Sequence, residues 1–361
     1  MSNHVRVTAI QARNRTIPYT RTGTEALSQI RSTIAILTGL AEAAADEGAR
    51  IVALPEDTLG TFEWEAGHPQ ELESFLMEAE KLMLDRFAEV AARRRVSVIC
   101  CNDCAHEGRI RNTAILIGPD GAEIGRYVKV HPALAERTRE PGTGFPVYEV
   151  PEVGSVGMCI CYDMMMPETT RALALNGADI VFDLTMGGAS LASGSASLAA
   201  FRTRAADNYL YIVVAFRSGG SLIISPRGEI LAEGGNEPDA LVSATIDPTT
   251  DREAGDALTG LTSDFRARLF RERNPAAYGV LTDPNPPAME RLKDVPVPTI
   301  EEAAALMARA LTTGADEFAQ AEKLAGAGDL TGARDRFTQL AGIFGTTWIG
   351  RRSQERLQEL G

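Results

Sequence analysis

The sequence is poor in cationic residues and in aromatic residues, and it has no long hydrophobic run. Lysine and arginine number 36 against 49 aspartates and glutamates, which gives a formal net charge of −13 at pH 7. A strongly acidic chain is repelled by nucleic-acid phosphates and by anionic lipids. A membrane-spanning helix needs about 20 consecutive apolar residues, and no stretch approaches that length. The composition therefore argues against nucleic-acid and membrane partners.

Cysteine is also scarce. The five cysteines are an odd number, and Cys100, Cys101 and Cys104 crowd together. Such a set fits a reducing compartment better than a disulfide framework. The first residues, MSNHVRVTAIQARN, lack a basic-then-apolar leader of the secretory kind. We therefore expect a cytoplasmic protein.

Strand-like and helix-like segments alternate over the first hundred residues. Residues 5–11 alternate between apolar and polar, as a strand does. Residues 27–44 carry an apolar stripe at spacings of three and four, which predicts a helix. The run 51–56 is typical of a buried strand, and a second helix and buried strand follow within 70–101. This order predicts helices packed on a sheet.

Hairpin signals come next in the sequence. Residues 112–118 and 124–130 are strand-like and flank a Pro-Asp-Gly turn. Helix-like segments begin at Pro167 and near Leu198, and each leads into another buried strand. Two blocks of strands, each with two flanking helices, predict an α/β fold of the four-layer α-β-β-α sandwich type that ends near residue 285.

The end of the chain differs from this pattern. We predict a sandwich domain over 1–285, a proline-rich linker over 286–298 and a small helical C-terminal extension over 299–361. Residues 329–340 resemble half of a tetratricopeptide-type hairpin. One such unit cannot bury a core by itself. We therefore expect the tail to pack on its own domain or on a partner subunit.

Cys161 is a candidate nucleophile at the end of the buried run VGMCIC. A polar turn and the helix that begins at Pro167 follow it, so backbone N–H groups gather around the thiol. Such surroundings lower a thiol pKa and can hold an oxyanion. Cys159, two residues earlier, fits buried packing. The alternative for Cys161 is an inert core residue, the usual state of a free cysteine.

Two charged residues stand in otherwise apolar segments. Glu56 closes the run IVALP, where an ionised carboxylate is unexpected. Its alternatives are an exposed strand end or a helix cap, and Asp57 beside it is a competing acid. Lys129 follows Tyr127 on one face of a strand-like segment, and its alternative is a solvated charge at a sheet edge.

These three segments resemble the motifs of the nitrilase superfamily of carbon–nitrogen hydrolases, whose catalytic triad is Glu-Lys-Cys. LPED at Leu54–Asp57 resembles the glutamate motif, YVKVHP at Tyr127–Pro132 the lysine motif and CYDMMMPETTR at Cys161–Arg171 the cysteine motif. The resemblance extends over roughly residues 5–285. Three motifs in this order are far more specific than any of them alone.

The resemblance implies a role for each matching residue. Glu56 would be the general base, Lys129 would stabilise the tetrahedral intermediate, and Cys161 would be the nucleophile. Tyr162 would donate its backbone N–H to the oxyanion. No metal and no cofactor is implied.

A second glutamate near the site is also implied by the resemblance. Glu136 matches it, and Glu140 is the alternative. The family further implies a homodimer or larger homo-oligomer. The Gly-, Ser- and Ala-rich stretch over 183–198 is a candidate lip of the substrate pocket.

The sequence Cys-Tyr-Asp after the strand resembles the amidase and carbamoyl-amide branches, whereas many nitrilases carry Cys-Trp-Glu there. We therefore expect a small-molecule amide or carbamoyl substrate that is hydrolysed through a thioester. One alternative is a nitrilase that converts a nitrile to a carboxylic acid and ammonia. Another is a catalytically silent scaffold that binds a partner through its tail.

A metal site needs separate consideration. Cys101 and Cys104, spaced as Cys-x-x-Cys, and His106 imitate half of a zinc site. A second pair at matching spacing is missing, and the cysteines lie in a buried strand-like run. We expect packing here, and no metal.

Overall fold

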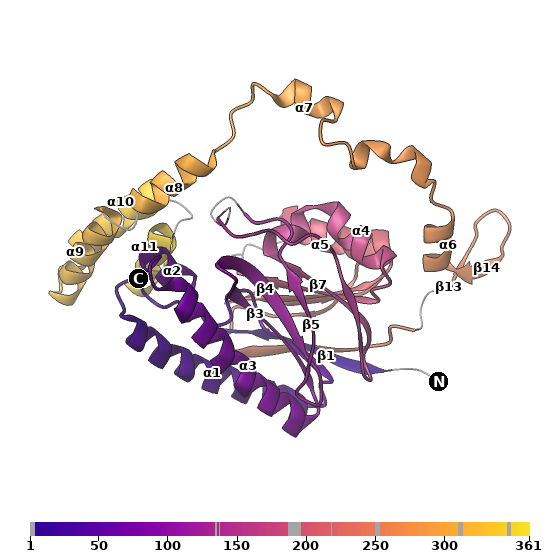
Figure 1. The fold of residues 1–361 in the computed structure, drawn as a ribbon, viewed down its shortest axis with the longest axis horizontal. Coiled ribbons are helices and arrows are strands. Elements are labelled where there is room, and N and C mark those ends of the chain that lie inside the picture. The colour runs from indigo at the N-terminus through magenta and orange to yellow at the C-terminus, as the bar shows by residue number, and fades with distance from the viewer. Residues whose placement is uncertain are drawn as a thin grey trace.

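Two facing six-stranded sheets form the centre of this computed structural model (Figure 1). The structure describes residues 4–133, 136, 138–186, 196–217, 219–249, 253–309, 313–344 and 348–361. The first sheet has the order β12 (Ala240–Ile246), β1 (Val5–Gln11), β2 (Ile51–Ala53), β3 (Ser97–His106), β4 (Arg109–Ile117) and β5 (Glu123–Val128). The second has the order β11 (Ile230–Glu233), β10 (Leu222–Ile224), β9 (Tyr211–Phe216), β8 (Ile180–Thr185), β7 (Gly154–Ile160) and β6 (Val147–Val150).

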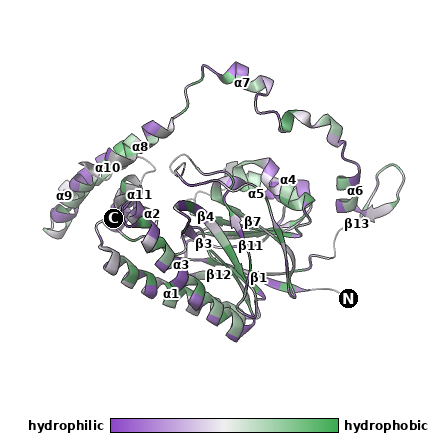
Figure 2. Cartoon of the chain, in the orientation of Figure 1, coloured by the Kyte–Doolittle hydropathy of each residue, from purple (hydrophilic) through white to green (hydrophobic). Residues whose placement is uncertain are grey.

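Helices cover the outer face of each sheet. The helices of the sandwich are α1 (Gly23–Asp46), α2 (Phe62–Gly67), α3 (Leu72–Arg94), the 3₁₀ helix η2 (Cys161–Met165), α4 (Pro167–Leu175) and α5 (Ala196–Asn208). One apolar cluster lies between α1, α3 and the first sheet, and another joins the two sheets with α4 and α5. In Figure 2 the strands are largely hydrophobic, whereas hydrophilic and hydrophobic residues alternate along the outer helices. The predicted four-layer α-β-β-α sandwich is confirmed.

Local signals explain where α1 forms. Thr22 and Glu25 make a reciprocal capping box, with Glu25 N to Thr22 Oγ1 at 3.3 Å and Thr22 N to Glu25 Oε2 at 2.9 Å. Ile30, Ile34 and Leu37 then recur on the buried face against the first sheet. The predicted apolar stripe is therefore the face that packs.

Strand β12 received no strand assignment from the sequence. It pairs antiparallel with β1, from Val5 opposite Ile246 to Gln11 opposite Ala240. The partners are more than 200 residues apart, so only the tertiary structure brings them together. β12 thereby completes the edge of the first sheet.

The last quarter of the chain is helical. A short hairpin of β13 (Glu253–Gly255) and β14 (Thr262–Asp264) leads into it. Its helices are α6 (Phe265–Arg271), η3 (Pro275–Ala277), η4 (Gly279–Leu281), α7 (Pro287–Leu292), α8 (Ile300–Arg309), α9 (Ala315–Gly326), α10 (Leu330–Phe344) and α11 (Trp348–Glu359). The predicted division at residues 285 and 299, and the tetratricopeptide-like character of the tail, stay predictions.

The tail lies on its own chain in this structure. Phe337, Leu340 and Phe344 of α10 form a small apolar cluster with other tail residues, and Tyr19 packs against it. Asn14 Nδ2 also donates to Glu355 Oε1 of α11 at 3.3 Å. The tail was expected to pack either on its own domain or on a partner subunit. In this structure it packs on its own domain. Among the described helices, none has both the length and the apolar content needed to cross a bilayer.

Candidate active site

The three motif residues stand just after strands of the two facing sheets. Glu56 follows β2, Lys129 follows β5 and Cys161 follows β7. β2 and β7 each pair in parallel with neighbouring strands. Sites in α/β proteins form where chains leave the carboxyl ends of such strands. The fold therefore positions these side chains to meet at one end of the sandwich.

Lys129 lies between two carboxylates. Its Nζ is 2.8 Å from Glu56 Oε1 and 2.6 Å from Glu136 Oε2. Lys129 is 2% exposed and Glu56 is 3% exposed. A charge this deeply buried persists only when it is paired. The structure thus brings three of the predicted site residues into direct contact.

Asn112 of β4 also bridges the carboxylates of Glu56 and Glu136. Its Nδ2 donates to Glu56 Oε1 and to Glu136 Oε1, each at 2.8 Å. Ala133 N also donates to Glu136 Oε2 at 3.0 Å. The sequence analysis missed Asn112. The available signal was a polar residue at a buried position of the strand β4. Its role is visible only once both glutamates are in place.

Glu56 is linked to Cys161 through the end of β8. Met186 N donates to Glu56 Oε2 at 3.0 Å. Thr185, the preceding residue, forms a side-chain hydrogen bond with the Cys161 thiol. Two consecutive residues therefore hold the two groups: Met186 binds Glu56 Oε2, and Thr185 binds the sulfur of Cys161.

Burial raises the pKa of the Cys161 thiol, and the negative charge of Glu56 raises it further. Lys129 and the Thr185 hydroxyl act in the opposite direction without cancelling the rise. The resting sulfur is therefore a thiol, and it needs a base to become a nucleophile. This result differs from the lowered thiol pKa that the strand-to-helix position of Cys161 led us to expect.

Opposing effects also decide the charges of Lys129 and Glu136. Burial alone would lower the pKa of Lys129, but Glu56, Cys161 and Glu136 outweigh it and raise that pKa. Burial followed by the Glu56 charge raises the pKa of Glu136, against the influence of Lys129. Lys129 is therefore a fixed cation, and Glu136 is the carboxyl that binds a proton more readily than an exposed glutamate.

The backbone at Cys161 has a left-handed conformation, with φ of 50°. Non-glycine residues rarely adopt this region, and they need support from their surroundings. Cys161 N donates to Asp183 Oδ1 at 3.0 Å, and Ile160 N donates to Asp163 Oδ2 at 3.1 Å. Two buried aspartates therefore hold the turn from β7 into η2.

His131 braces the loop that carries the lysine motif. Its backbone N–H and its Nδ1 both lie 2.8 Å from Asp163 Oδ1. Tyr127 donates its hydroxyl to Asp163 Oδ2 at 2.6 Å. The lysine motif and the cysteine motif are thereby tied together around one aspartate.

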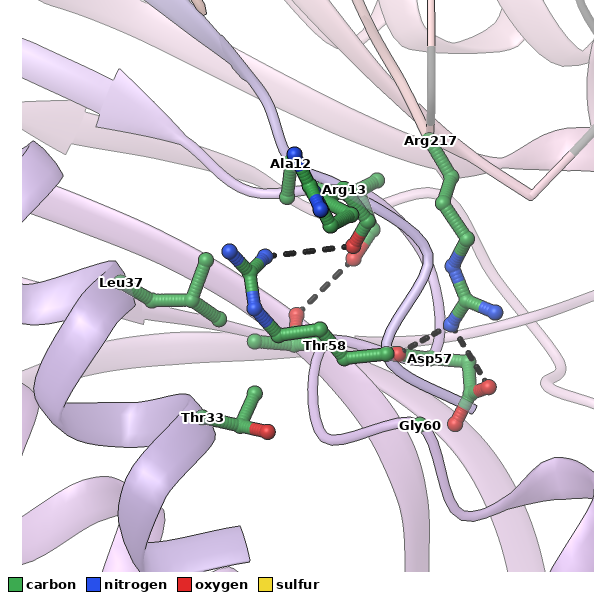
Figure 3. Close-up of a pocket in the computed structure, with 10 residues that line it drawn as sticks. Ala12, Arg13, Thr33, Leu37, Asp57, Thr58, Gly60 and Arg217 are labelled. Atoms are coloured by element: carbon green, nitrogen blue, oxygen red, sulfur yellow. Dashed lines mark hydrogen bonds and ion pairs between the residues drawn. The ribbon is translucent and has the colours of Figure 1, made fainter. Parts of the chain in front are cut away.

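The loop that carries Glu56 is fixed from outside by Arg217, which follows β9. Arg217 Nη2 donates to Asp57 Oδ2 at 2.6 Å and to the Asp57 carbonyl (Figure 3). It also donates to the Glu56 carbonyl at 3.3 Å. The same loop passes close to the backbone of Arg15 at Gly60. This glycine has φ of 79°, and a Cβ there would lie 2.3 Å from the Arg15 carbonyl oxygen. The competing acid Asp57 therefore pairs with Arg217, whereas its neighbour Glu56 pairs with Lys129.

A second arginine holds the segment that carries Glu136. Arg139 Nη2 donates to Glu65 Oε2 at 2.6 Å, and its Nε donates to Asp103 Oδ2 at 2.7 Å. Arg139 N also donates to the Glu136 carbonyl at 2.7 Å. The sequence analysis did not single out Arg139, because its partners come from α2 and β3.

The structure separates the alternatives that the sequence left open. Glu140 pairs with Arg109 and with Arg111 Nε at 2.6 Å, whereas Glu136 is the one of the two that contacts Lys129. The Tyr162 side chain is exposed. Its N–H lies in the first turn of η2, where a helix leaves donors unpaired.

The half-zinc alternative at β3 is excluded by strand geometry. Cys101 points into the cluster between the sheets, whereas Cys104 points into the cluster under the helices. Residues three apart in a strand face opposite sides and cannot bind one ion. His106 is exposed at the strand end. Of the expected pocket lip, residues 187–195 lie outside the described part of the chain.

The tail reaches the neighbourhood of the Glu56 loop. Burial raises the pKa of Glu63 in α2 to about 7, and the positive charges of Arg352 and Arg351 in α11 oppose this rise. Asp57 also acts electrostatically on Glu63. α11 is therefore close enough to influence charges beside the site, which nothing in the sequence indicated.

The fold and this buried Glu-Lys-Glu network beside a cysteine define a class of enzyme. The sequence model described as "Carbon-nitrogen hydrolase" matches residues 6–255, more than half of the chain. The chain belongs to the carbon–nitrogen hydrolase family. It is a hydrolase of carbon–nitrogen bonds other than peptide bonds.

Curated relatives of the chain include two amidases and a nitrilase. It is 28% identical over 237 residues to the deaminated glutathione amidase of Synechocystis sp., covering 58% of this chain and 84% of the relative. It is 29% identical over 229 residues to omega-amidase NIT2 of Homo sapiens, covering 56% and 79%. It is also 32% identical over 222 residues to a nitrilase of Pyrococcus abyssi, covering 58% and 80%.

Solved structures agree on the fold. A carbon–nitrogen hydrolase from Helicobacter pylori superposes with a TM-score of 0.62 at 21% identity, covering 78% of this chain and 98% of that one. An amidase from Nesterenkonia sp. superposes with a TM-score of 0.57 at 21% identity, covering 75% and 96%. At this identity the likeness concerns the fold alone.

Proposed function

We propose that the chain hydrolyses the carbon–nitrogen bond of a small amide or carbamoyl compound through a Cys161 thioester, releasing ammonia or an amine. One observation carries the proposal. Lys129 joins Glu56 and Glu136 in a buried network, and the charges of Glu56 and Lys129 both act on the Cys161 thiol. A carboxylate, an ammonium and a thiol in one desolvated place are the groups that nucleophilic acyl transfer needs.

The first half of the reaction forms the thioester. Because the resting sulfur is a thiol, its proton passes to Glu56 as the sulfur attacks the amide carbon. The carbonyl oxygen becomes an oxyanion that the Tyr162 N–H and the Lys129 cation stabilise; each preorganised donor contributes roughly 3 kcal/mol. The carbon–nitrogen bond then breaks, and Glu56 returns the proton to the leaving nitrogen.

The second half releases the acid. Glu56 takes a proton from water, whose oxygen attacks the thioester carbon. The carbon–sulfur bond breaks, and the sulfur recovers the proton. Lys129 keeps its charge throughout, because the acids around it raise its pKa. Glu136 holds Lys129 in position from the side opposite Glu56.

The relatives support an amide as the substrate. Two of them carry amidase names, and Cys161 is followed by Tyr-Asp, as in the amidase-like branches. Nitrile hydrolysis is a second candidate, favoured by the 32% identity to the nitrilase of Pyrococcus abyssi. Ammonia release from a matched panel of aliphatic amides, carbamoyl compounds and nitriles separates the two, and we expect the amides or carbamoyl compounds to react fastest.

Electrophile labelling of Cys161 tests whether the site is active at all. In Glu56→Gln the amide cannot accept the thiol proton, so labelling by iodoacetamide at neutral pH is expected to slow by roughly 100-fold. Rates measured by mass spectrometry on folded protein provide the comparison. If Glu56→Gln labels as fast as the parent chain and no panel compound releases ammonia, the chain is a silent scaffold instead.

We also propose that the chain assembles as a homodimer or larger homo-oligomer. Residues 274–299 support this, because the segment arches away from the body between α6 and α8 (Figure 1) and is almost wholly exposed. Its exposed large apolar side chains are Tyr278, Val280, Leu281, Met289, Leu292, Val295 and Val297. Soluble proteins rarely leave so many such side chains together without a partner.

The oligomer is tested through this arm, residues 274–299. Val280→Ser with Leu281→Ser removes two apolar contacts and is expected to lower the mass measured by light scattering. Met77→Ser, on an exposed apolar side chain of α3, is the matched control and is expected to leave the mass unchanged. A monomeric mass for the unaltered chain, or an unchanged mass for the double variant, would count against the arm as the interface.

A further inference from the structure

Asp183 is a buried acid directly behind the nucleophile. It lies in the middle of β8, opposite Cys159 of β7, and has no exposed surface. Its Oδ1 accepts from Cys161 N at 3.0 Å and from Cys159 Sγ at 3.5 Å. Val181, two residues earlier on the same face of the strand, belongs to the apolar core, so strand packing alone gives no reason for a carboxyl here.

The two oxygens of Asp183 are unequally satisfied. Within the described residues, Asp183 Oδ2 is buried without a hydrogen-bond partner. Asp163, the other fully buried aspartate near Cys161, has donors for both oxygens, from Tyr127, Ile160 and His131. An ionised carboxylate with a bare oxygen in the core costs several kcal/mol, whereas a carboxylic acid costs much less.

The charges around Asp183 favour the acid form as well. Burial raises its pKa, and Asp163 and Glu56 raise it further, while the hydrogen bonds from Cys159 and Cys161 act the other way. The groups facing it from β7, η2 and the Glu56 loop are thus thiols and acids, and no cation contacts it among the described residues.

We propose that Asp183 is a positioning residue that acts as a neutral carboxylic acid, holding the Cys161 backbone in its left-handed turn without placing a negative charge beside the sulfur. Cys161 N has left the ladder of β7 and needs an acceptor. The short side chain of Asp183 supplies the acceptor, and its neutrality leaves thiolate formation to Glu56.

This inference rests on the proposed function only in that Cys161 is the nucleophile. It predicts different results for two substitutions. Asp183→Asn keeps the volume and the acceptor, so kcat should stay within about threefold of the parent chain. Asp183→Leu keeps the volume and removes the acceptor, so the turn relaxes and kcat should fall roughly 10- to 100-fold with KM little changed.

Alkylation of Cys161 by iodoacetamide across pH provides a readout independent of amide turnover. If Asp183 is neutral, Asp183→Asn should leave the midpoint of the alkylation profile within about 0.3 pH unit. If Asp183 is charged, removing that charge lowers the midpoint by about one unit or more, which would overturn the proposal.

Each remaining outcome is also decisive. Full kcat in Asp183→Leu would show that the turn holds itself, which contradicts the positioning role. A folded but inactive Asp183→Asn contradicts the neutral acid. If Asp183→Leu does not fold, the Asp183→Asn profile still decides the charge. Failure of the proposed function looks different, because the parent chain itself then shows neither turnover nor Glu56-dependent labelling.

Discussion

Cys161→Ala is expected to reduce amide hydrolysis by more than about 10⁴-fold, because the other four cysteines are buried and only Cys161 is partly accessible to a substrate. The fold should be unaffected, since the thiol is small and lies at the edge of the core. Ammonia release with the best panel substrate measures the loss, and thermal unfolding checks the fold. Electrophile labelling at this position should disappear as well.

Cys100→Ala is the matched control for that variant. Cys100 is a buried strand cysteine on the helix-covered face of the first sheet, and burial raises its pKa to about 12. Its removal should leave turnover within about threefold and cost about 1 kcal/mol of stability. Equal losses of turnover in the two variants would mean that Cys161 is not the nucleophile.

Lys129→Met should have the second-largest effect, on both turnover and stability. It leaves Glu56 and Glu136 buried together without their cation, and removing one partner of a buried ion pair costs roughly 3 kcal/mol or more. Turnover should fall by more than about 10³-fold, since the oxyanion loses its positive charge. Denaturant unfolding and ammonia release measure the two effects separately.

The stability loss in Lys129→Met should depend on pH. Without the cation, the pKa of Glu136, already raised by burial and by Glu56, rises further in the folded state. A carboxyl with a raised folded pKa contributes stability below its unfolded pKa and loses it as pH rises through the folded pKa. The variant should therefore be closer to the parent chain at pH 5 than at pH 8.

The double variant Lys129→Met with Glu136→Gln separates the two roles of Lys129. Removing one carboxylate should restore much of the stability, while turnover stays low because the cation is still absent. If turnover recovers together with stability, Lys129 acts only by holding the site together. If stability is not restored, repulsion between Glu56 and Glu136 is not the cause of the stability loss in Lys129→Met.

Local chemistry was enough to predict much of this protein from its sequence. The apolar stripe over residues 27–44 predicted α1 within a few residues of its ends. The Asp-Gly turn determines the β4–β5 hairpin. The order of the Glu56, Lys129 and Cys161 motifs indicated the family. Each of these signals lies within a short stretch of chain, where periodicity and turn chemistry act.

The site depends on contacts that no short stretch contains. Lys129 meets Glu56 across 73 residues, and Asn112 completes the pair from a third segment. The raised pKa of Cys161 follows from burial among those groups. Position after a strand predicted the opposite, because it accounts for helix N–H groups and omits desolvation and the neighbouring carboxylate.

The sequence by itself determined most of the elements, the family and the candidate residues Glu56, Lys129 and Cys161, because those are encoded in spacing and residue type. Only the tertiary structure decided which acids contact Lys129, that Asp57 pairs with Arg217, that α11 lies near the Glu56 loop, and that Asp183 accepts from the Cys161 backbone. Burial and pairing arise when distant segments pack, and they determine the charge of each group.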